Sequence, residues 1–201
     1  MSVKIENTAI KGLYLGNNAL QKAYLGSNLI YQKGGNYEDI KFTSCPFPTS
    51  WTEVVAGTKY KATNDYGEWR VISTDTSTLN NACYKAFDSY YDTVCCLSTN
   101  PRWVEIDLPD GVLIKPSDYY ISFGRSTNTD EIQGFNPLTN QWEKIKNLLR
   151  TRTQSSQNYN YNGSTYFSKF RIYSTEIYTS SQSALYIYSF NINGGMLRKE
   201  N

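Results

Sequence analysis

Asp88, Asp92 and Thr93 place two carboxylates and a hydroxyl within six residues of one another. Carboxylate, hydroxyl and backbone carbonyl oxygens are the ligands that a hard cation such as Ca²⁺ prefers. The alternative is structural, because an aspartate often accepts backbone N–H groups to hold a turn. The spacing therefore leaves two interpretations, a metal site at these three residues or a hydrogen-bonded turn.

The sequence contains few of the residues and motifs that enzymes use for catalysis. It has 201 residues and no histidine, which excludes an imidazole base and an imidazole metal ligand. The 18 Asp and Glu could supply a pair of glycosidase carboxylates, but no motif singles out such a pair. Nucleophile-elbow, phosphate-loop and dinucleotide glycine patterns are missing from the sequence. We therefore expect no catalytic residues and no enzymatic activity.

Charge and hydropathy argue against two classes of partner. The chain carries 20 Lys and Arg against 18 Asp and Glu, a net charge of +2 that is too small to indicate nucleic-acid binding. It contains no apolar stretch long enough to span a membrane, and its first residues lack a secretory pattern. The four cysteines match no zinc spacing, and we expect them to be free thiols that pack as small core residues.

The composition predicts an all-β protein. The chain has 18 Tyr, 8 Phe and 4 Trp, which with Val, Ile and Thr favour strands, whereas its many Asn and Ser favour turns. A helical turn or two is expected only around residues 81–87, and residues 151–165 are expected to form a loop that is either mobile or a binding loop. Short strands are expected at residues 52–55, 69–73, 103–108, 119–123, 132–135, 142–145, 166–173 and 185–192.

Alternation in residues 103–108 assigns the two faces of one strand. Val104, Ile106 and Leu108 share a face that we expect in the core. Asp107 falls on the other face, where we expect it to pair with Arg or Lys of a neighbouring strand. Regularly spaced strands with turn signals between them predict a β-sandwich or barrel.

A ten-residue repeat sets the first 35 residues apart. Each unit is a short apolar run, then Gly-Asn-Asn or Gly-Ser-Asn, then a second apolar run, which predicts two β-hairpins. Hairpins this short are marginal alone, so the segment is expected to dock or oligomerise, the alternative being a plain extension of the domain. The expected docking residues are apolar: Leu13, Tyr14, Leu15, Tyr24, Leu25 and Ile30.

Domain boundaries follow from these patterns. Paired glycines at positions 34 and 35 end the repeat, and residues 36–41 are expected to be a linker. The strand-rich region is assigned to residues 42–196. Residues 197–201 are expected to be a tail.

Three motifs in the strand-rich region resemble the discoidin family, the coagulation factor V/VIII C-type domain. The first is the segment 86–95, which begins Ala-Phe-Asp, and the second is Trp103 with Asp107 and Leu108. A third, at residues 136–145, resembles a hairpin of the same family. The sequence departs from the family at Ser89, which stands at a glycine position where a left-handed backbone would be strained, and at Cys95 and Pro109.

The resemblance implies a galactose-binding-like jelly-roll β-sandwich. It implies a structural calcium in the loop that contains Asp88, and ligand binding by loops at one end of the sandwich. Sugar recognition needs an aromatic ring for the C–H face and planar polar groups for the hydroxyls. The residues expected to serve this purpose, including two from the segment 158–162, are Tyr90, Tyr91, Asn100, Arg102, Arg125, Asn128, Tyr159 and Tyr161.

The N-terminal repeat is similar to hairpin segments of bacteriophage tail and surface proteins. The combined expectation is a non-catalytic virion adhesin, assembled in the host cytoplasm, whose sandwich binds host cell-surface carbohydrate. Its N-terminus would dock to other virion proteins, and a homotrimer is the oligomer that phage fibres imply. The alternatives are a purely structural decoration or fibre protein and a carbohydrate-binding module of a cellular surface protein. The missing secretory pattern argues against the last of these.

Overall fold

The computed structural model describes residues 37–74, 82–90, 93–98, 101–124, 126–127, 129–175 and 184–200. It also describes the backbone of residues 14–15, 18–19, 22–25 and 28–32. The described residues fall into two compact units, one before Glu38 and one over Glu38–Lys199. No described helix is long and apolar enough to cross a membrane.

The first unit contains two β-hairpins. Strand β1 (Tyr14–Leu15) pairs antiparallel with β2 (Asn18–Ala19), and β3 (Lys22–Leu25) pairs antiparallel with β4 (Asn28–Gln32). The Gly-Asn and Gly-Ser pairs of the repeat lie between the paired strands. The two predicted hairpins are confirmed, whereas the side chains expected to dock lie outside the described residues.

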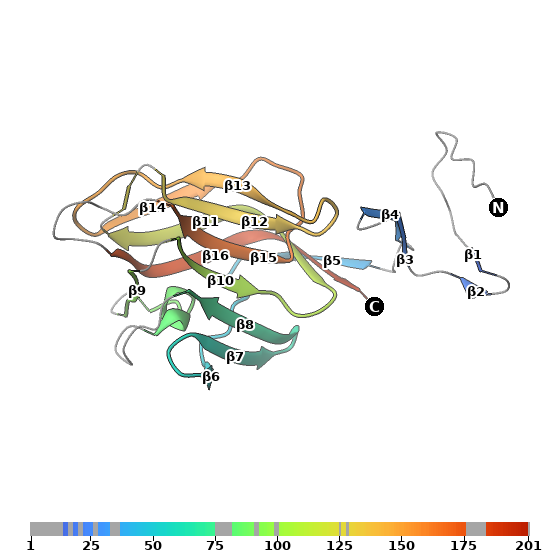
Figure 1. Cartoon of the computed structure of the whole chain (residues 1–201), viewed down its shortest axis with the longest axis horizontal. Coiled ribbons are helices and arrows are strands. Elements are labelled where there is room, and N and C mark those ends of the chain that lie inside the picture. Colours follow the sequence, from blue (N-terminus) through green and yellow to red (C-terminus); the bar gives the residue numbers. More distant parts are fainter. Residues whose placement is uncertain are drawn as a thin grey trace. The chain divides into compact units, whose positions relative to one another are not determined.

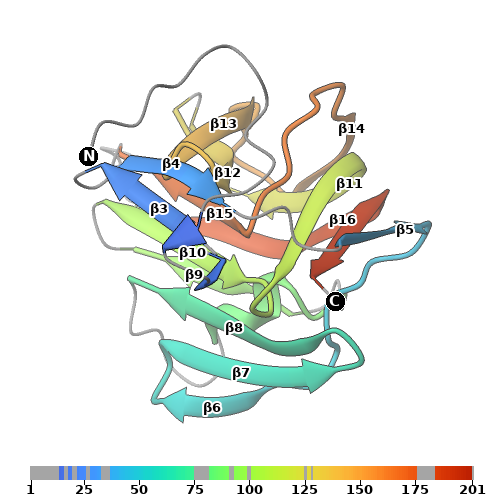
Figure 2. The same cartoon turned by 90° about the vertical axis from the view of Figure 1, so that its right-hand side faces the viewer.

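The second unit has two β-sheets, one of seven strands and one of five. The seven-stranded sheet has the order β13-β12-β15-β10-β8-β7-β6, and Figure 2 shows β6, β7, β8 and β10 following one another across it. Its strands are β6 (Thr52–Val55), β7 (Lys59–Asn64), β8 (Gly67–Ser73), β10 (Arg102–Asp107), β12 (Glu131–Asn136), β13 (Gln141–Asn147) and β15 (Lys169–Ser174).

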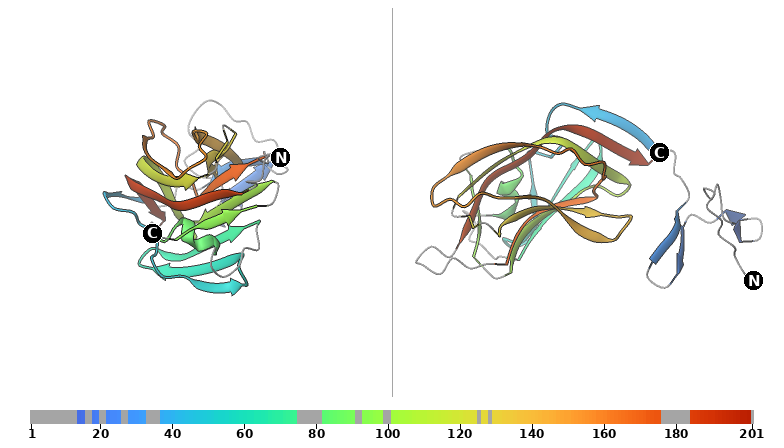
Figure 3. Two further views of the ribbon diagram at one scale, coloured as in Figure 1. Left: turned by 90° about the vertical axis from the view of Figure 1, so that its left-hand side faces the viewer. Right: turned by 90° about the horizontal axis from the view of Figure 1, so that it is seen from above.

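The five-stranded sheet has the order β14-β11-β16-β5, and β9 pairs with β16. Its strands are β5 (Tyr37–Phe42), β9 (Cys95–Leu97), β11 (Val112–Gly124), β14 (Ser155–Asn160) and β16 (Leu185–Glu200). The two sheets lie as facing layers (Figures 1 and 3). The all-β sandwich predicted from the sequence is confirmed.

The core lies between the sheets and is built by alternation. Val104 and Ile106 of β10 are fully buried and belong to the same hydrophobic cluster as Ile121 of β11 and Ile187 of β16. The predicted inward face of residues 103–108 is therefore confirmed. Asp107 on the opposite face lies 3.0 Å from the Lys169 ammonium of β15, the cross-strand pair that the pattern predicts.

The boundaries expected for the linker and the tail were wrong. Strand β5 covers most of residues 36–41, and β16 continues through residues 197–200. Ile40 and Phe42 pack against the core from β5, and Leu197 is fully buried on β16. The linker assignment relied on the two glycines and overlooked the alternation of Ile40 and Phe42 with charged neighbours.

The polar run at residues 151–165 is not one long loop. It contains β14, an edge strand in which Ser155, Gln157 and Tyr159 are half-buried and the residues between them are exposed. Tyr159 stacks on Tyr119 of β11 with ring centroids 5.4 Å apart. A strand without aliphatic residues gives little hydrophobic signal, so the sequence pattern missed it.

The predictions of a short helical turn and of free cysteines were correct. A 3₁₀ helix, η2, covers Cys83–Ala86, where one or two helical turns were expected. All four cysteines are free thiols, with Cys95 buried in the core and Cys96 only half-buried. Burial raises the pKa of the Cys83 thiol to about 12 and that of Cys45 to about 11, which makes both poor nucleophiles. Strands β7 and β9 were not predicted.

Candidate functional site

One end of the sandwich brings several polar segments together, and we call it the loop end. It is formed by the starts of β10 and β12, the ends of β11 and β15, and residues 148–151. Trp103 and Glu131 both pair with Tyr173, so β10 and β12 begin on either side of the end of β15. The antiparallel register therefore brings residues distant in sequence to this end.

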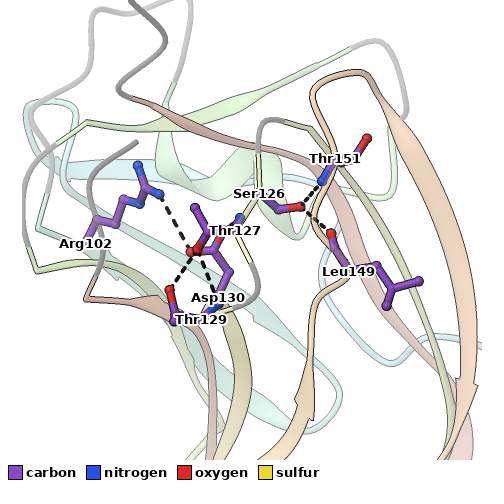
Figure 4. A network of polar contacts seen from close by, with 7 residues as sticks. All are labelled: Arg102, Ser126, Thr127, Thr129, Asp130, Leu149 and Thr151. Atoms are coloured by element: carbon purple, nitrogen blue, oxygen red, sulfur yellow. Dashed lines mark hydrogen bonds and ion pairs between the residues drawn. The ribbon is translucent and has the colours of Figure 1, made fainter. Parts of the chain in front are cut away.

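An ion pair lies buried at the base of the loop end (Figure 4). Arg102 is 1% exposed and Asp130 is fully buried, and Arg102 Nη2 lies 3.6 Å from Asp130 Oδ1. Desolvation raises the pKa of the Asp130 carboxyl, and the guanidinium opposes this rise. A buried ion pair adds little net stability, because the desolvation of both charges offsets their attraction. Its contribution here is to link the first residue of β10 to the turn that precedes β12.

Asp130 also shapes the turn that precedes β12. Its Oδ2 accepts the backbone N–H of Thr127 at 2.7 Å, and its backbone carbonyl accepts the N–H of Leu148 at 2.8 Å. The hydroxyls of Thr127 and Thr129 lie 2.8 Å apart. A carboxylate that accepts backbone N–H bonds in this way holds the turn in one conformation.

Ser126 connects this turn to the segment after β13. Its hydroxyl donates to the Leu149 carbonyl and accepts the backbone N–H of Thr151 at 3.2 Å (Figure 4). Ser126 is fully buried, whereas Leu149 is 61% exposed. The loop end therefore has a rigid hydrogen-bonded base with apolar and polar groups above it.

Arg102 was expected to contact a ligand, and the structure corrects this. With 1% exposure its guanidinium is turned toward Asp130 and is not available at the surface. The residue sits at an inward position of β10, next in alternation to Val104, which the sequence pattern could have indicated. Its role is to position the loop end. Tyr91, Asn100, Arg125 and Asn128 lie outside the described residues.

Of the three other candidate tyrosines, one is exposed and two pack against the sandwich. Tyr90 is 60% exposed and follows Ser89. Tyr159 pairs with Tyr119, and the Tyr161 N–H donates to the Ser117 carbonyl at 2.8 Å, toward the opposite end of β11. The Tyr161 ring packs on Phe167 of the core, with ring centroids 5.8 Å apart. Tyr159 and Tyr161 therefore take part in packing against the sandwich.

The contacts of Asp88 match the turn-holding alternative. Its carboxylate accepts the Tyr90 N–H at 2.9 Å and the Thr93 hydroxyl at 3.0 Å. Ser89 has a φ of 63°, the left-handed conformation that its position implied, and its hydroxyl donates to Asn191 Oδ1 at 2.9 Å. Among the described residues, no group of three or more Asp, Glu, Cys or His could hold a metal ion. Asp92 lies outside the described residues, so calcium binding stays a prediction.

A second polar cluster covers the outer face of the seven-stranded sheet. Glu105 and Asp107 each lie 3.0 Å from the Lys169 ammonium. Burial, and next the neighbouring Asp107 carboxylate, raise the pKa of Glu105 to about 7. Beside them the Arg171 guanidinium lies over the Trp142 ring, 4.0 Å from its centroid. These contacts join three strands on one surface.

Sequence reasoning missed Ser126, Thr127 and Asp130, the residues that build the loop end. They are the sequence neighbours of Arg125 and Asn128, the two residues of this segment that were expected to contact a ligand. The spacing of Thr127 and Asp130, with a carboxylate three residues after a backbone N–H that it can accept, was a usable signal of a closed turn. The pairing with Arg102 had no local signal, because it joins the start of β10 to the turn before β12.

No family model matches the chain, and no curated protein does. Several solved structures are similar to it. The family 32 carbohydrate-binding module of Clostridium perfringens NanJ, solved with galactose, has 13% identity and a TM-score of 0.48, and the match covers 65% of this chain and 93% of that one. The family 62 module of Clostridium thermocellum Xyl5A has 22% identity and a TM-score of 0.46, covering 63% and 94%.

A third similar structure is chitosan-binding module 1 of a chitosanase/glucanase from Paenibacillus sp. IK-5. It has 13% identity and a TM-score of 0.48, and the match covers 60% of this chain and 90% of that one. At these identities and scores, the three proteins set no expectation for the ligand of this chain.

Proposed function

We propose that the sandwich is a non-catalytic carbohydrate-binding domain whose loop end holds a host cell-surface glycan. The observation that carries the proposal is the buried Arg102–Asp130 pair, with the hydrogen bonds that fix the loops around it. A purely stabilising core would be served as well by apolar residues, so the pair is best explained by a need for fixed loop positions. Fixed loops lower the entropy lost when a ligand binds.

The sequence supports this role independently. The Asp88 turn of the resembled discoidin family is present, with Ser89 in the left-handed conformation that the family gives to glycine. The candidate contact residues of the segment 125–128 flank the fixed positions of Ser126, Thr127 and Thr129. Amide and guanidinium groups in such positions can meet sugar hydroxyls.

The larger proposal is a bacteriophage tail or virion surface adhesin. In it, the N-terminal hairpins dock to other virion proteins and the chain forms a homo-oligomer, with a trimer as the first choice. The support is the ten-residue repeat and the division of the chain before Glu38. Short hairpins need a surface to pack on, which a particle or sister subunits would supply.

The test is a glycan array that carries host polysaccharides, probed with the whole chain in the presence of Ca²⁺ and again with a chelator. We expect binding to at least one glycan. Asn128→Ala should weaken that binding at least about tenfold. The control is Gln141→Ala, which removes an exposed amide at the start of β13, at the opposite end of that sheet, and should leave binding unchanged.

Two other outcomes would contradict the proposal, and a third would extend it. Binding to no polysaccharide, with or without calcium, would favour a purely structural decoration or fibre protein. Equal losses in the two variants would place the glycan away from the loop end. Loss of binding on chelation alone would add a structural calcium at the Asp88 loop.

A further inference from the structure

A groove of about 570 Å³ lies on the five-stranded sheet, far along β11 from the loop end. It is bounded by the end of β5, by residues 115–118 of β11 and by residues 193–196 of β16. Ligand sites for small molecules typically have volumes of about 300–1,000 Å³. The groove is therefore large enough for one or two sugar rings.

The floor of the groove depends on two glycines. A Cβ at Gly194 would lie 2.5 Å from Asp118 Oδ2, and a Cβ at Gly195 would collide with the Lys115 carbonyl oxygen. The register between β11 and β16 shifts on both sides of Asp118, so the sheet bulges there. The two glycines and the bulge therefore allow β16 to lie unusually close to β11 at this point. The concave shape is thus built into the sheet.

Two cations flank the groove from the strands on either side of β16. Lys41 of β5 is exposed and Lys115 of β11 is half-buried. Neither ammonium forms an ion pair with any described residue, and Lys115 Nζ lies 5.4 Å from the centroid of the Tyr166 ring. The nearby Asp39 is already paired with Arg198, at 2.7 Å and 2.9 Å. Both lysine ammonium groups are therefore available to pair with an anionic ligand.

The rest of the lining suits the other groups of a sugar. Asp118 and Asn193 offer a carboxylate and an amide, and the Ser117 hydroxyl donates to Asp118 Oδ2 at 3.0 Å. Met196, which is half-buried, supplies a small apolar surface for C–H groups. A few convergent polar groups of this kind fix the orientation of a small polar ligand.

We propose that this groove is a second glycan site that takes a sugar residue bearing a carboxylate, such as a hexuronic acid. Lys41 and Lys115 would meet the carboxylate, and Asp118 and Asn193 would meet the ring hydroxyls. The proposal does not depend on the loop end, since the two sites share no residue. A chain with both sites could hold two units of one acidic polysaccharide and gain avidity from the pair.

The test is an NMR titration of the ¹⁵N-labelled whole chain with sodium D-galacturonate, D-galactose and sodium acetate. We expect galacturonate to shift the amides of Asn193, Gly194 and Gly195 saturably. Galactose should bind at least about tenfold more weakly, and acetate should produce no comparable shift. Removing both lysines, as Lys41→Ala with Lys115→Ala, should weaken galacturonate binding at least about tenfold.

The control replaces Lys59 and Lys61 of β7 by Ala, which makes the same charge change at exposed positions of the other sheet. It should leave the titration unchanged. The proposal is overturned by an absence of shifts with galacturonate, by equal shifts with acetate, or by unchanged binding after loss of Lys41 and Lys115. The Asn128→Ala variant separates the two proposals, because it should spare galacturonate binding at the groove.

Discussion

Arg102 shows how one side chain can be essential for a surface without reaching it. The guanidinium is buried 3.6 Å from an equally buried carboxylate, and together they hold the start of β10 against the turn before β12. An exposed arginine at this place would be free to meet a ligand but could not define where the loops sit. At the residue scale, the proposed binding function thus depends on a positioning residue as much as on contact residues.

This buried pair predicts a large difference between two arginine variants. Arg102→Met leaves the Asp130 carboxylate buried without its cation, and we expect a loss of about 3–5 kcal/mol in the free energy of unfolding. Arg70→Met removes an exposed partner of Glu68, and its loss should stay within about 1 kcal/mol. Urea unfolding of both variants measures the difference. Similar losses would mean that the Asp130 pair is not isolated from water.

Glu105 predicts a pH dependence of stability. Its pKa of about 7 in the folded chain lies above the ordinary Glu value, so folding favours the protonated form. The resulting stabilisation is complete below the ordinary pKa and is lost as the pH rises through about 7. Between pH 4.5 and 8, wild type should lose on the order of 1–3 kcal/mol more than Glu105→Gln.

The measurement is urea unfolding across this pH range, with Glu38→Gln as the control. Glu38 is exposed on β5, and its replacement should leave the wild-type profile in place. The groups that face Glu105 are Asp107 on its own strand and Lys169 and Arg171 on β15. Parallel profiles for wild type and Glu105→Gln would show that the Lys169 pair keeps the carboxylate ionised.

Strands with an aliphatic face were predictable from the sequence, whereas polar strands were not. The alternation of Val104, Ile106 and Leu108 placed β10 and its inward face correctly. Strand β14 was not predicted, because its inward residues are Ser155, Gln157 and Tyr159. Their burial depends on the pairing with β11, which the local sequence does not reveal. At the element scale, a strand can be predicted from the sequence only where apolar residues alternate with polar ones.

Strand β12 passes directly beneath an aromatic ring, and this predicts a selective effect of added volume. A Cβ at Gly134 would lie 2.5 Å from the Phe167 ring, whereas at Gly124 the nearest atom is 3.4 Å away. We expect Gly134→Ala to cost about 1–3 kcal/mol through overpacking, and Gly124→Ala to cost less. Thermal or urea unfolding of the two variants decides this, and equal costs would contradict the tight packing of β12.

The candidate site was less predictable than the fold. The loop end joins residues from β10, the β11–β12 turn and the segment after β13, which meet only through the antiparallel register. The sequence pointed to Arg125 and Asn128 of this turn but not to the contact of the turn with Arg102. The groove on the five-stranded sheet had no sequence signal, because its shape comes from a bulge and two glycines on paired strands.

At the scale of the whole molecule, the division before Glu38 predicts that the sandwich folds alone. A fragment of residues 37–201 retains β5 and should unfold at the same urea concentration as the second unit of the whole chain. A fragment of residues 43–201 lacks β5, and with it the buried Phe42 side chain. It should be less stable by at least about 2 kcal/mol, since burying one such side chain contributes about 1.5–3 kcal/mol. If the fragment of residues 37–201 is unfolded, the N-terminal hairpins are needed for the sandwich to fold, which would contradict this prediction.

The two units divide the proposed adhesin into an attachment part and a recognition part. The hairpins carry the repeat, and the sandwich carries both the loop end and the groove. Such a division lets the recognition surface be tested without a particle. It also predicts that residues 1–36 are required for oligomerisation. Loss of the oligomer should lower the avidity for a polysaccharide while leaving the affinity of each site unchanged.

The central claim, that the sandwich itself binds glycan, is tested most directly by calorimetric titration of one array-selected glycan into the whole chain and into residues 37–201. We predict the same Kd per site for both, within about twofold. A folded fragment that fails to bind a glycan held by the whole chain would assign recognition to the N-terminal segment and contradict this account.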